Sequence, residues 1–376
     1  MNTKSWFKVD KSLIIIFIAF AIISVAAISS SLSILPDFAS NIVPKQIIWF
    51  GLGIPLILFI MKTGNEYFYR HATIFYCICI VLLLFVLFFG IEVNGATRWF
   101  SIPYLGNFQP SEFMKLALIL ILGKEIHEFN ENSLQTSSEY EFKLISKCFL
   151  LTLIPSILIL IQPDTGGALM LFVIMFVMLF VSGISYKWFG IFIGLASALI
   201  SLFIGIYFIS DNLFINLFGT GSFYRLDRIL NWAGNDSLQL TNALMSMGSS
   251  GILGSGHGNI PIYFPEAATD FIFSVIASSW GLVGAIILIL LYIAFFIKVT
   301  GIINKTTNNL NKYIGSGILG ILIFSTIWNI GMNLGLLPII GLPLPFISYG
   351  GSSIFTAIIM LAIIFNINNE NIRFTN

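Results

Sequence analysis

An isolated carboxylate lies between two long apolar runs, in the sequence Gln162-Pro163-Asp164 followed closely by two glycines. Pro163 lacks a backbone N–H and therefore predicts the end of the preceding helix. Asp164 is then expected at the start of the next helix, at the edge of a membrane. An ionisable group in membrane-spanning sequence costs about 2.5–3.5 kcal/mol on insertion scales and marks a candidate functional site. Capping of the following helix is the structural alternative, since Asp is a favoured N-cap residue.

A second charged group opens another apolar run. Pro110 suits the first turn of a helix, and Glu112 and Lys115, three residues apart, then share one helical face. Two interpretations stay open for this pair. Either the two side chains neutralise each other as a structural ion pair, or the pair faces a polar cavity shared with Asp164.

The composition identifies the elements that must position these groups. Hydrophobic residues make up 57% of the 376 residues and charged residues only 9%, which excludes a soluble domain. Apolar runs of about 17–25 residues, each long enough to cross a bilayer, recur along the chain. We predict one all-α, polytopic membrane domain over residues 1–376 and no nucleic-acid partner. Ten spans are expected near 12–31, 46–62, 72–90, 111–126, 146–161, 166–184, 188–209, 270–297, 313–332 and 350–367.

The distribution of Lys and Arg predicts the orientation of these spans. Thirteen of the 18 basic residues fall on the inner side if the N-terminus is cytoplasmic, and four fall on the outer side. Both termini are therefore expected inside, with Asp164 opening outward. Among the few outer cations, Arg98 and Arg225 could bind a substrate or simply pair with nearby acids, such as Glu92 or Glu112 for Arg98.

Two outer segments are irregular. A large loop over about 210–269 contains Arg225 and a glycine-rich run at 248–258, which could cradle phosphate, form a flexible lid or make a tight re-entrant turn. Asp270 follows this loop at the start of the eighth span. Prolines and glycines then break the apolar segment 338–351, and such backbone is tolerated at membrane depth only where protein or a wet cavity satisfies it. We predict that this segment dips into the protein and lines a cavity.

Five motifs, in this order, resemble the SEDS family (shape, elongation, division and sporulation), which includes RodA and FtsW. They are Asn94-Gly95-Ala96-Thr97-Arg98-Trp99; Phe108-Gln109-Pro110-Ser111-Glu112 with Lys115; Gln162-Pro163-Asp164; Pro265-Glu266 with Thr269-Asp270-Phe271-Ile272-Phe273; and Pro343-Leu344-Pro345-Phe346-Ile347-Ser348-Tyr349-Gly350-Gly351-Ser352.

The resemblance implies ten spanning helices and a peptidoglycan glycosyltransferase that polymerises lipid II at the outer face of the bacterial cytoplasmic membrane. It implies that Asp164 is the catalytic residue, and a divalent cation (Mg²⁺ or Mn²⁺) without an organic cofactor. It also implies a class B penicillin-binding protein as transpeptidase partner, with other elongation or division machinery. The residues expected to contact substrate are Arg98, Glu112, Lys115, Gln162, Arg225, Asp270, Ser348 and Tyr349. No ligand cluster in the sequence specifies a metal site.

The expected chemistry follows from the linkages of substrate and product. Lipid II carries its sugar on a diphosphate in α linkage and the glycan is β-1,4, so one inversion indicates a single in-line displacement. Asp164 would take the proton from the acceptor 4-hydroxyl, a step worth about 10²–10⁴-fold for a positioned base. Arg98, Lys115 and Arg225 are the cations expected to stabilise the diphosphate.

The sequence departs from the family pattern at two places. Gly167 stands where a hydroxyl residue is usual, and Ser278-Ser279 stand where the family often carries two glutamates. The stretch 329–332 favours the RodA subfamily, whereas 265–267 is more typical of FtsW. Two other functions stay open: a transporter that flips the lipid-linked precursor, which the lack of an inverted repeat disfavours, and a non-catalytic scaffold for a transpeptidase, which Asp164 disfavours.

Overall fold

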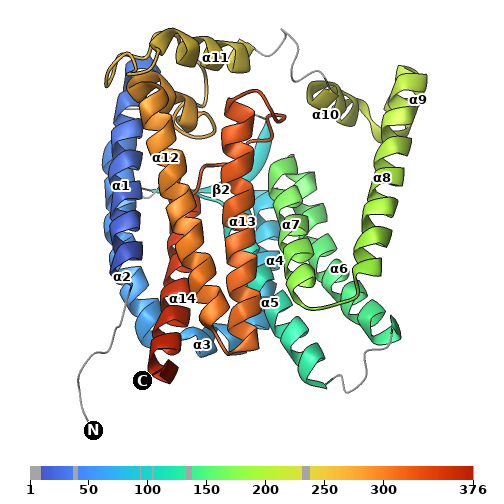
Figure 1. Cartoon of the computed structure of the whole chain (residues 1–376). Helices are drawn as coiled ribbons and strands as arrows, with labels where there is room; N and C mark the ends of the chain where they lie inside the picture. Colours follow the sequence, from blue (N-terminus) through green and yellow to red (C-terminus); the bar gives the residue numbers. More distant parts are fainter. Residues whose placement is uncertain are drawn as a thin grey trace.

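The computed structural model describes residues 10–36, 41–93, 95–103, 106–132, 138–230 and 238–375. Helices dominate it (Figure 1). Their bounds are α1 (Lys11–Ser31), α2 (Ile42–Thr63), α3 (Asn65–Arg70), α4 (Ala72–Phe89), α5 (Pro110–Asn132), α6 (Ser138–Ile161), α7 (Thr165–Val181), α8 (Tyr186–Ile209), α9 (Asp211–Phe218), α10 (Thr220–Leu230), α11 (Leu238–Ser250), α12 (Ile272–Lys305), α13 (Asn309–Asn333) and α14 (Gly351–Thr375).

All ten predicted spans coincide with helices. Among the described residues, eight helices are long and apolar enough to cross a membrane: α1, α2, α4, α6, α8, α12, α13 and α14. The other two predicted spans are α7, which is shorter at 17 residues, and α5, which carries Glu112, Lys115 and further charges. The all-α, polytopic membrane fold is therefore confirmed. The start of α1 and the end of α14 lie at the same end of the bundle (Figure 1).

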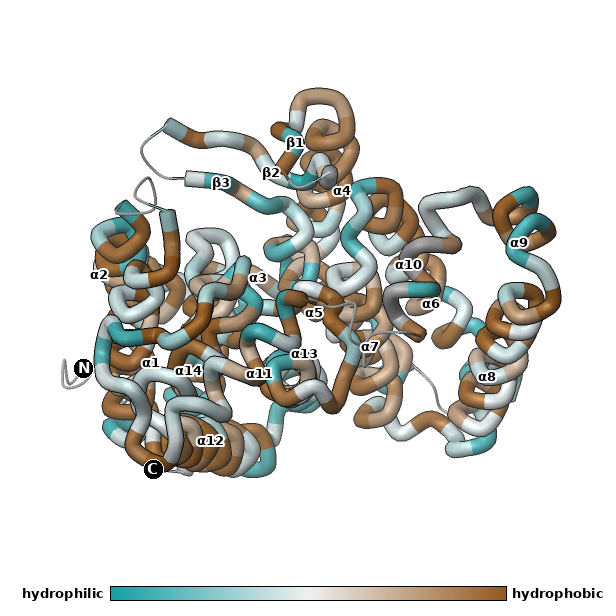
Figure 2. Tube along the Cα trace, turned by 90° about the horizontal axis from the view of Figure 1, so that it is seen from above, coloured by the Kyte–Doolittle hydropathy of each residue, from teal (hydrophilic) through white to brown (hydrophobic). Residues whose placement is uncertain are grey.

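The position of α5 explains how a spanning helix can carry charges. It packs against α4, α6, α7, α13 and α14, and every residue from Met114 to Gly123 is buried. Because neighbouring helices surround it, α5 can aim polar side chains into the protein rather than into lipid. Hydrophobic residues instead follow the peripheral helices α4 and α12 when the bundle is seen from above (Figure 2).

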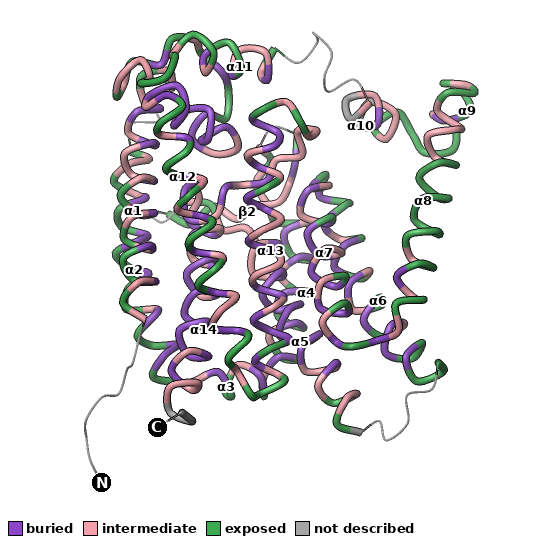
Figure 3. The backbone as a smooth tube through the Cα atoms, viewed as in Figure 1, coloured by how far each residue is buried: buried purple, intermediate pink, exposed green. Residues whose placement is uncertain are grey.

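α8 lies at the edge of the molecule. Phe189, near its start, is its one buried residue among the 24. Figure 3 shows the contrast between this largely exposed helix and the buried positions of α13 and α14. An apolar helix without protein neighbours along most of its length is what a lipid-facing span requires.

A small antiparallel sheet connects α4 to α5 and was not predicted. Its strands are β1 (Ile91–Val93), β2 (Ala96–Ile102) and β3 (Gly106–Phe108), in the order β1-β2-β3. Phe100 is opposite Phe108 in the β2–β3 pairing. The sheet leads the chain into Pro110, and β2 carries Arg98 near its middle. It therefore fixes that cation relative to the first turn of α5.

The segment between α13 and α14 enters the protein, as predicted. Leu342, Leu344 and Phe346 are at most 2% exposed, and Pro343 and Pro345 line a cavity. Phe346 has a φ of +64°, in the left-handed region. Such a backbone costs about 1–3 kcal/mol, and the ring is held by stacking on Phe20 at 5.6 Å between centroids. Packing therefore stabilises an irregular segment at membrane depth.

The glycine-rich run at 248–258 forms a tight turn packed on α12. Gly254 and Gly281 both have positive φ, and a Cβ on either would overlap the backbone of the other's segment. Gly281 also interrupts the helical geometry of α12. Ser278 and Ser279, one of the predicted departures from the family pattern, join α12 to α11 and α1: Ser278 Oγ is 2.9 Å from Ser246 Oγ, and Ser279 Oγ is 2.6 Å from Ser30 Oγ. The serines therefore have a packing role here.

Candidate active site

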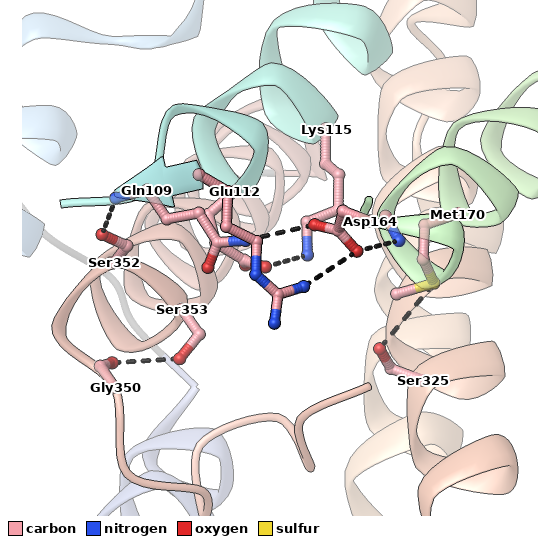
Figure 4. A network of polar contacts seen from close by, with 11 residues as sticks. Gln109, Glu112, Lys115, Asp164, Met170, Ser325, Gly350, Ser352 and Ser353 are labelled. Atoms are coloured by element: carbon pink, nitrogen blue, oxygen red, sulfur yellow. Dashed lines mark hydrogen bonds and ion pairs between the residues drawn. The ribbon is translucent and has the colours of Figure 1, made fainter. Parts of the chain in front are cut away.

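Asp164 caps α7 and faces two further donors. Its Oδ1 accepts a 2.9 Å hydrogen bond from the Gly167 backbone N–H, so the predicted capping role is confirmed. The same oxygen lies 3.4 Å from the Arg98 guanidinium, and Gln109 Nε2 donates to Oδ2 at 3.2 Å (Figure 4). The residue is 6% exposed. Capping and a charged site are therefore properties of one carboxylate rather than alternatives.

The two glycines after Asp164 make this geometry possible. A Cβ on Gly167 would lie 2.8 Å from Asp164 Oδ2, so the carboxylate occupies the space that a side chain there would need. A Cβ on Gly166 would overlap the Ile340 carbonyl oxygen. The first turn of α7 thus touches the re-entrant segment directly. Gly167, one of the departures from the family pattern, is explained by this close approach.

Arg98 pairs with Asp164 and not with the acids expected as its structural partners. Its guanidinium lies 4.3 Å from the centroid of the Trp99 ring, and its side chain is 25% exposed. Its Nε is buried and has no hydrogen-bond partner within the described chain. The pairing expected with Glu92 or Glu112 is thus replaced by one with Asp164. Donors remain on the guanidinium for an anionic ligand.

Glu112 and Lys115 form the predicted ion pair, with 2.7 Å between Lys115 Nζ and Glu112 Oε1. Both line a cavity of about 30 Å³, together with Ser325 and Thr356. The Thr356 hydroxyl has no partner among the described atoms. Asp164 is not one of the lining residues, and most of the lining is apolar, so the pair faces a largely apolar cavity rather than the predicted polar cavity shared with Asp164. Figure 4 shows the two groups side by side.

Three residues that are predicted to contact substrate form hydrogen bonds within the protein. Gln162 is 1% exposed and donates from Nε2 to the Leu83 carbonyl at 3.1 Å. Ser348 Oγ donates to the Thr269 carbonyl at 2.6 Å and accepts from Leu344 N–H. The Tyr349 backbone N–H donates to the Ala268 carbonyl at 2.8 Å. The Ser348 and Tyr349 bonds fasten the re-entrant segment to the residues before α12, and the Gln162 bond joins the residue after α6 to α4. Contact of these side chains with substrate stays a prediction.

Asp270 lies beside the same segment. It directly precedes the N-cap residue of α12, and its Oδ2 would be 3.4 Å from a Cβ on Gly341. Since Gly166 touches Ile340, the first turn of α7 and the Asp270 carboxylate approach neighbouring residues of one segment. Arg225, the remaining predicted contact residue, lies in α10, and its side chain is outside the described residues.

Sequence reasoning assigned no role to three polar residues that the structure brings to this region. Gln109 belongs to one of the motifs, and its position just before Pro110 was the available signal. Asn329 and Asn333, one turn apart near the end of α13, are fully buried and bind the Asp270 carbonyl. A buried amide facing a backbone carbonyl from another helix leaves no local sequence signal.

The described residues contain no group of three or more His, Cys, Asp or Glu side chains that could hold a metal ion. Within this described part, Arg98 forms an ion pair with Asp164, and Lys115 forms one with Glu112.

Fold and site together define a multi-pass membrane protein with a carboxylate–guanidinium site where α5, α7 and the re-entrant segment meet. Residues 10–373 match the family model described as cell cycle protein, of the FtsW, RodA and SpoVE type. The chain belongs to this family, which confirms the resemblance drawn from its motifs.

Individual relatives agree with this membership. The chain is 36% identical over 317 residues to the probable peptidoglycan glycosyltransferase FtsW of Haemophilus influenzae, covering 80% of this chain and 74% of that one. It is also similar to a chain of a solved structure described as "Structural coordination of polymerization and crosslinking by a peptidoglycan synthase complex". The TM-score is 0.80, and the identity is 27% over 96% of this chain and 98% of that one. The crystal structure of Thermus thermophilus RodA matches with a TM-score of 0.68 and 27% identity over 97% and 98%.

Proposed function

We propose that this chain, a peptidoglycan glycosyltransferase of the FtsW and RodA family, polymerises lipid II into β-1,4 glycan strands. The Haemophilus influenzae relative named above is called a probable peptidoglycan glycosyltransferase. The observation that supports the proposal most is the placement of Asp164 against Arg98 and Gln109, because a carboxylate and a cation at one point can serve proton removal and diphosphate binding together. Relatives of both subfamily names occur, and we propose the elongation role typical of RodA.

Asp164 is the proposed general base. It accepts hydrogen bonds from Gly167 and Gln109 and forms an ion pair with Arg98 before substrate is present, so the acceptor 4-hydroxyl must replace one of these groups. The Gly167 bond belongs to the helix cap and stays. Gln109 is the neutral donor, so its exchange costs less electrostatic energy than that of Arg98. The hydroxyl would then donate to Oδ2, within the 2.6–3.2 Å reach that a base needs.

The diphosphate leaving group develops negative charge as the sugar departs. Arg98 supplies a planar fork with unpaired donors, and Lys115 supplies a second positive charge that Glu112 holds in place. Arg225 belongs to the same proposal on its sequence motif. A divalent cation, Mg²⁺ or Mn²⁺, would bind through the diphosphate, since the described residues form no cluster of their own.

Asp270 is the alternative base. It borders the same re-entrant segment through Gly341, and it is partly exposed whereas Asp164 is buried. If Asp270 removes the proton, Asp164 has the role of holding Arg98 toward the diphosphate.

The test of the proposed activity is glycan synthesis from lipid II by the purified chain in detergent and in liposomes. Long glycan strands are the expected product. Translocation of lipid II across liposomes without any polymer would favour a flippase. Polymer that appears only when an active polymerase of another class is supplied would favour a scaffold.

Orientation and partner belong to the same proposal. The site faces the outside of the bacterial cytoplasmic membrane, supported by the excess of Lys and Arg on the opposite end. A class B penicillin-binding protein binds the chain, supported by the solved synthase complex that the chain resembles. Co-purification in detergent should recover the complex with raised glycan synthesis. Failure to recover it, with full activity of the isolated chain, would contradict the partnership.

A further inference from the structure

Two buried asparagines near the outer end of α13 join three separate segments. Asn329 and Asn333 are both 0% exposed and lie four residues apart, on one face of the helix. Asn329 Nδ2 donates to the Asp270 carbonyl at 2.9 Å and to the Leu342 carbonyl at 2.7 Å. Asn333 Nδ2 donates to the same Asp270 carbonyl at 3.0 Å. The pair therefore connects α13 to the start of α12 and to the re-entrant segment.

The other end of the Asn333 amide caps α12 from a neighbouring helix. Its Oδ1 accepts from the Ser274 backbone N–H at 3.1 Å and from Ser274 Oγ at 2.6 Å. The N-cap residue of α12 is Phe271, which makes no side-chain capping bond. The first backbone N–H groups of a helix have no partner inside that helix. Asn333 supplies one of these missing acceptors at Ser274, and this holds the first turn of α12, which begins two residues after Asp270.

The segments joined by the pair carry Asp270 and contact the start of the helix that Asp164 caps. Asp270 is held through its own carbonyl, and its carboxylate borders Gly341. Leu342 follows Gly341, and Ile340 before it touches Gly166 at the start of the helix that Asp164 caps. A shift of segment 340–342 therefore changes the position of Asp270 relative to Asp164.

We infer that Asn329 and Asn333 are positioning residues for glycosyl transfer, setting the separation of Asp164 and Asp270 through the re-entrant segment. This inference rests on the proposed function. Neither amide touches the candidate site, and each acts through a backbone carbonyl. A misplacement of about 1 Å at reacting groups can lower a rate about 100-fold. The pair should therefore control kcat more than KM.

The experiment compares Asn329→Leu with a matched control, Asn366→Leu. Asn366 is also buried in a helix, and its Nδ2 donates to the Ile60 carbonyl and to Asn65 Oδ1, both at 3.0 Å. It lies 15 residues beyond the start of α14, roughly 22 Å along the helix and toward the opposite end of the bundle. Both variants lose a buried amide, so both should lower the unfolding temperature.

We expect the two variants to differ in kcat when they are compared at equal amounts of folded protein. Asn329→Leu should lower kcat for lipid II about 10- to 100-fold with KM changed less than about threefold. Asn366→Leu should keep kcat within about twofold. Equal kcat losses in both, or wild-type kcat in Asn329→Leu, would overturn the inference. If Asn329→Leu does not fold, Asn329→Ser, which keeps one donor, takes its place in the same comparison.

Hydrogen–deuterium exchange separates this inference from the proposed function. Peptides covering 264–275 and 334–350 should exchange faster in the Asn329 variant than in the Asn366 variant. Unchanged exchange would show that the asparagines do not hold these segments. If the wild-type chain makes no glycan, the proposed activity fails while the exchange data still decide whether the pair holds the segments together.

Discussion

Substituting Arg98 by Lys separates diphosphate binding from simple charge pairing with Asp164. The guanidinium lies 3.4 Å from Asp164 Oδ1 and 4.3 Å from the Trp99 ring centroid. The guanidinium carries five N–H donors, and its Nε has no hydrogen-bond partner within the described residues. A Lys ammonium could keep the ion pair but not the planar fork that binds two phosphate oxygens.

The expected loss of kcat/KM in Arg98→Lys can be worked out from the loss of one charge-assisted hydrogen bond. Such a bond is worth about 1.5–3 kcal/mol, which corresponds to roughly 10- to 150-fold in rate or affinity. We expect Arg98→Lys to lower kcat/KM for lipid II by this factor, and Arg98→Ala to lower it further because the Asp164 pairing is lost as well. The assay is steady-state glycan synthesis against lipid II concentration.

Arg70→Lys is the matched control, since Arg70 lies on the exposed surface of α3 at the other end of the bundle. It should leave kcat/KM unchanged. Wild-type kinetics in Arg98→Lys would refute the diphosphate role and leave Arg98 as a structural partner of Asp164.

Three other outcomes follow from the structure. Lys115→Met should destabilise the chain by about 3–5 kcal/mol because it leaves the Glu112 carboxylate uncompensated. Adding Glu112→Gln to this variant should restore part of the unfolding temperature in detergent. Losses of unfolding temperature that simply add in the double variant would contradict a buried pair. Gly254→Ala and Gly281→Ala should each lower that temperature, whereas Gly51→Ala, with open space around its Cα, should not; equal effects of all three would contradict the packed turn. EDTA should abolish glycan synthesis, and Mg²⁺ or Mn²⁺ should restore it, without changing the unfolding temperature of the substrate-free chain; a lowered unfolding temperature would reveal a resident metal.

The sequence predicts the spans well because each apolar run has to meet a single requirement: it must be long enough to cross the bilayer. It predicts the Glu112–Lys115 pair for a similarly local reason, since both residues lie on one helical turn. The re-entrant segment 338–351 was also predictable, because prolines in apolar sequence need protein around them.

The composition of the site around Asp164 could not be predicted to the same extent. Arg98 reaches Asp164 across 66 positions of sequence, from a short strand that apolar periodicity does not reveal. The Asn329 and Asn333 contacts depend on how α13 packs against α12, and helical spacing alone does not give that arrangement. Gln162 is the opposite case, a residue to which the sequence did assign a role. Its motif predicts contact with substrate, and in the structure its amide binds the Leu83 carbonyl.

The most direct test of the account is glycan synthesis by purified Asp164→Asn beside Asp270→Asn, each matched to wild type for folded protein. The substitution of Asp by Asn is nearly isosteric and leaves an oxygen that can accept the Gly167 cap and face Arg98, so folding and membrane insertion should be kept. The account predicts that Asp164→Asn abolishes polymerisation. Near-normal glycan yield from Asp164→Asn, with loss of activity confined to Asp270→Asn, would contradict Asp164 as the base and assign that role to Asp270.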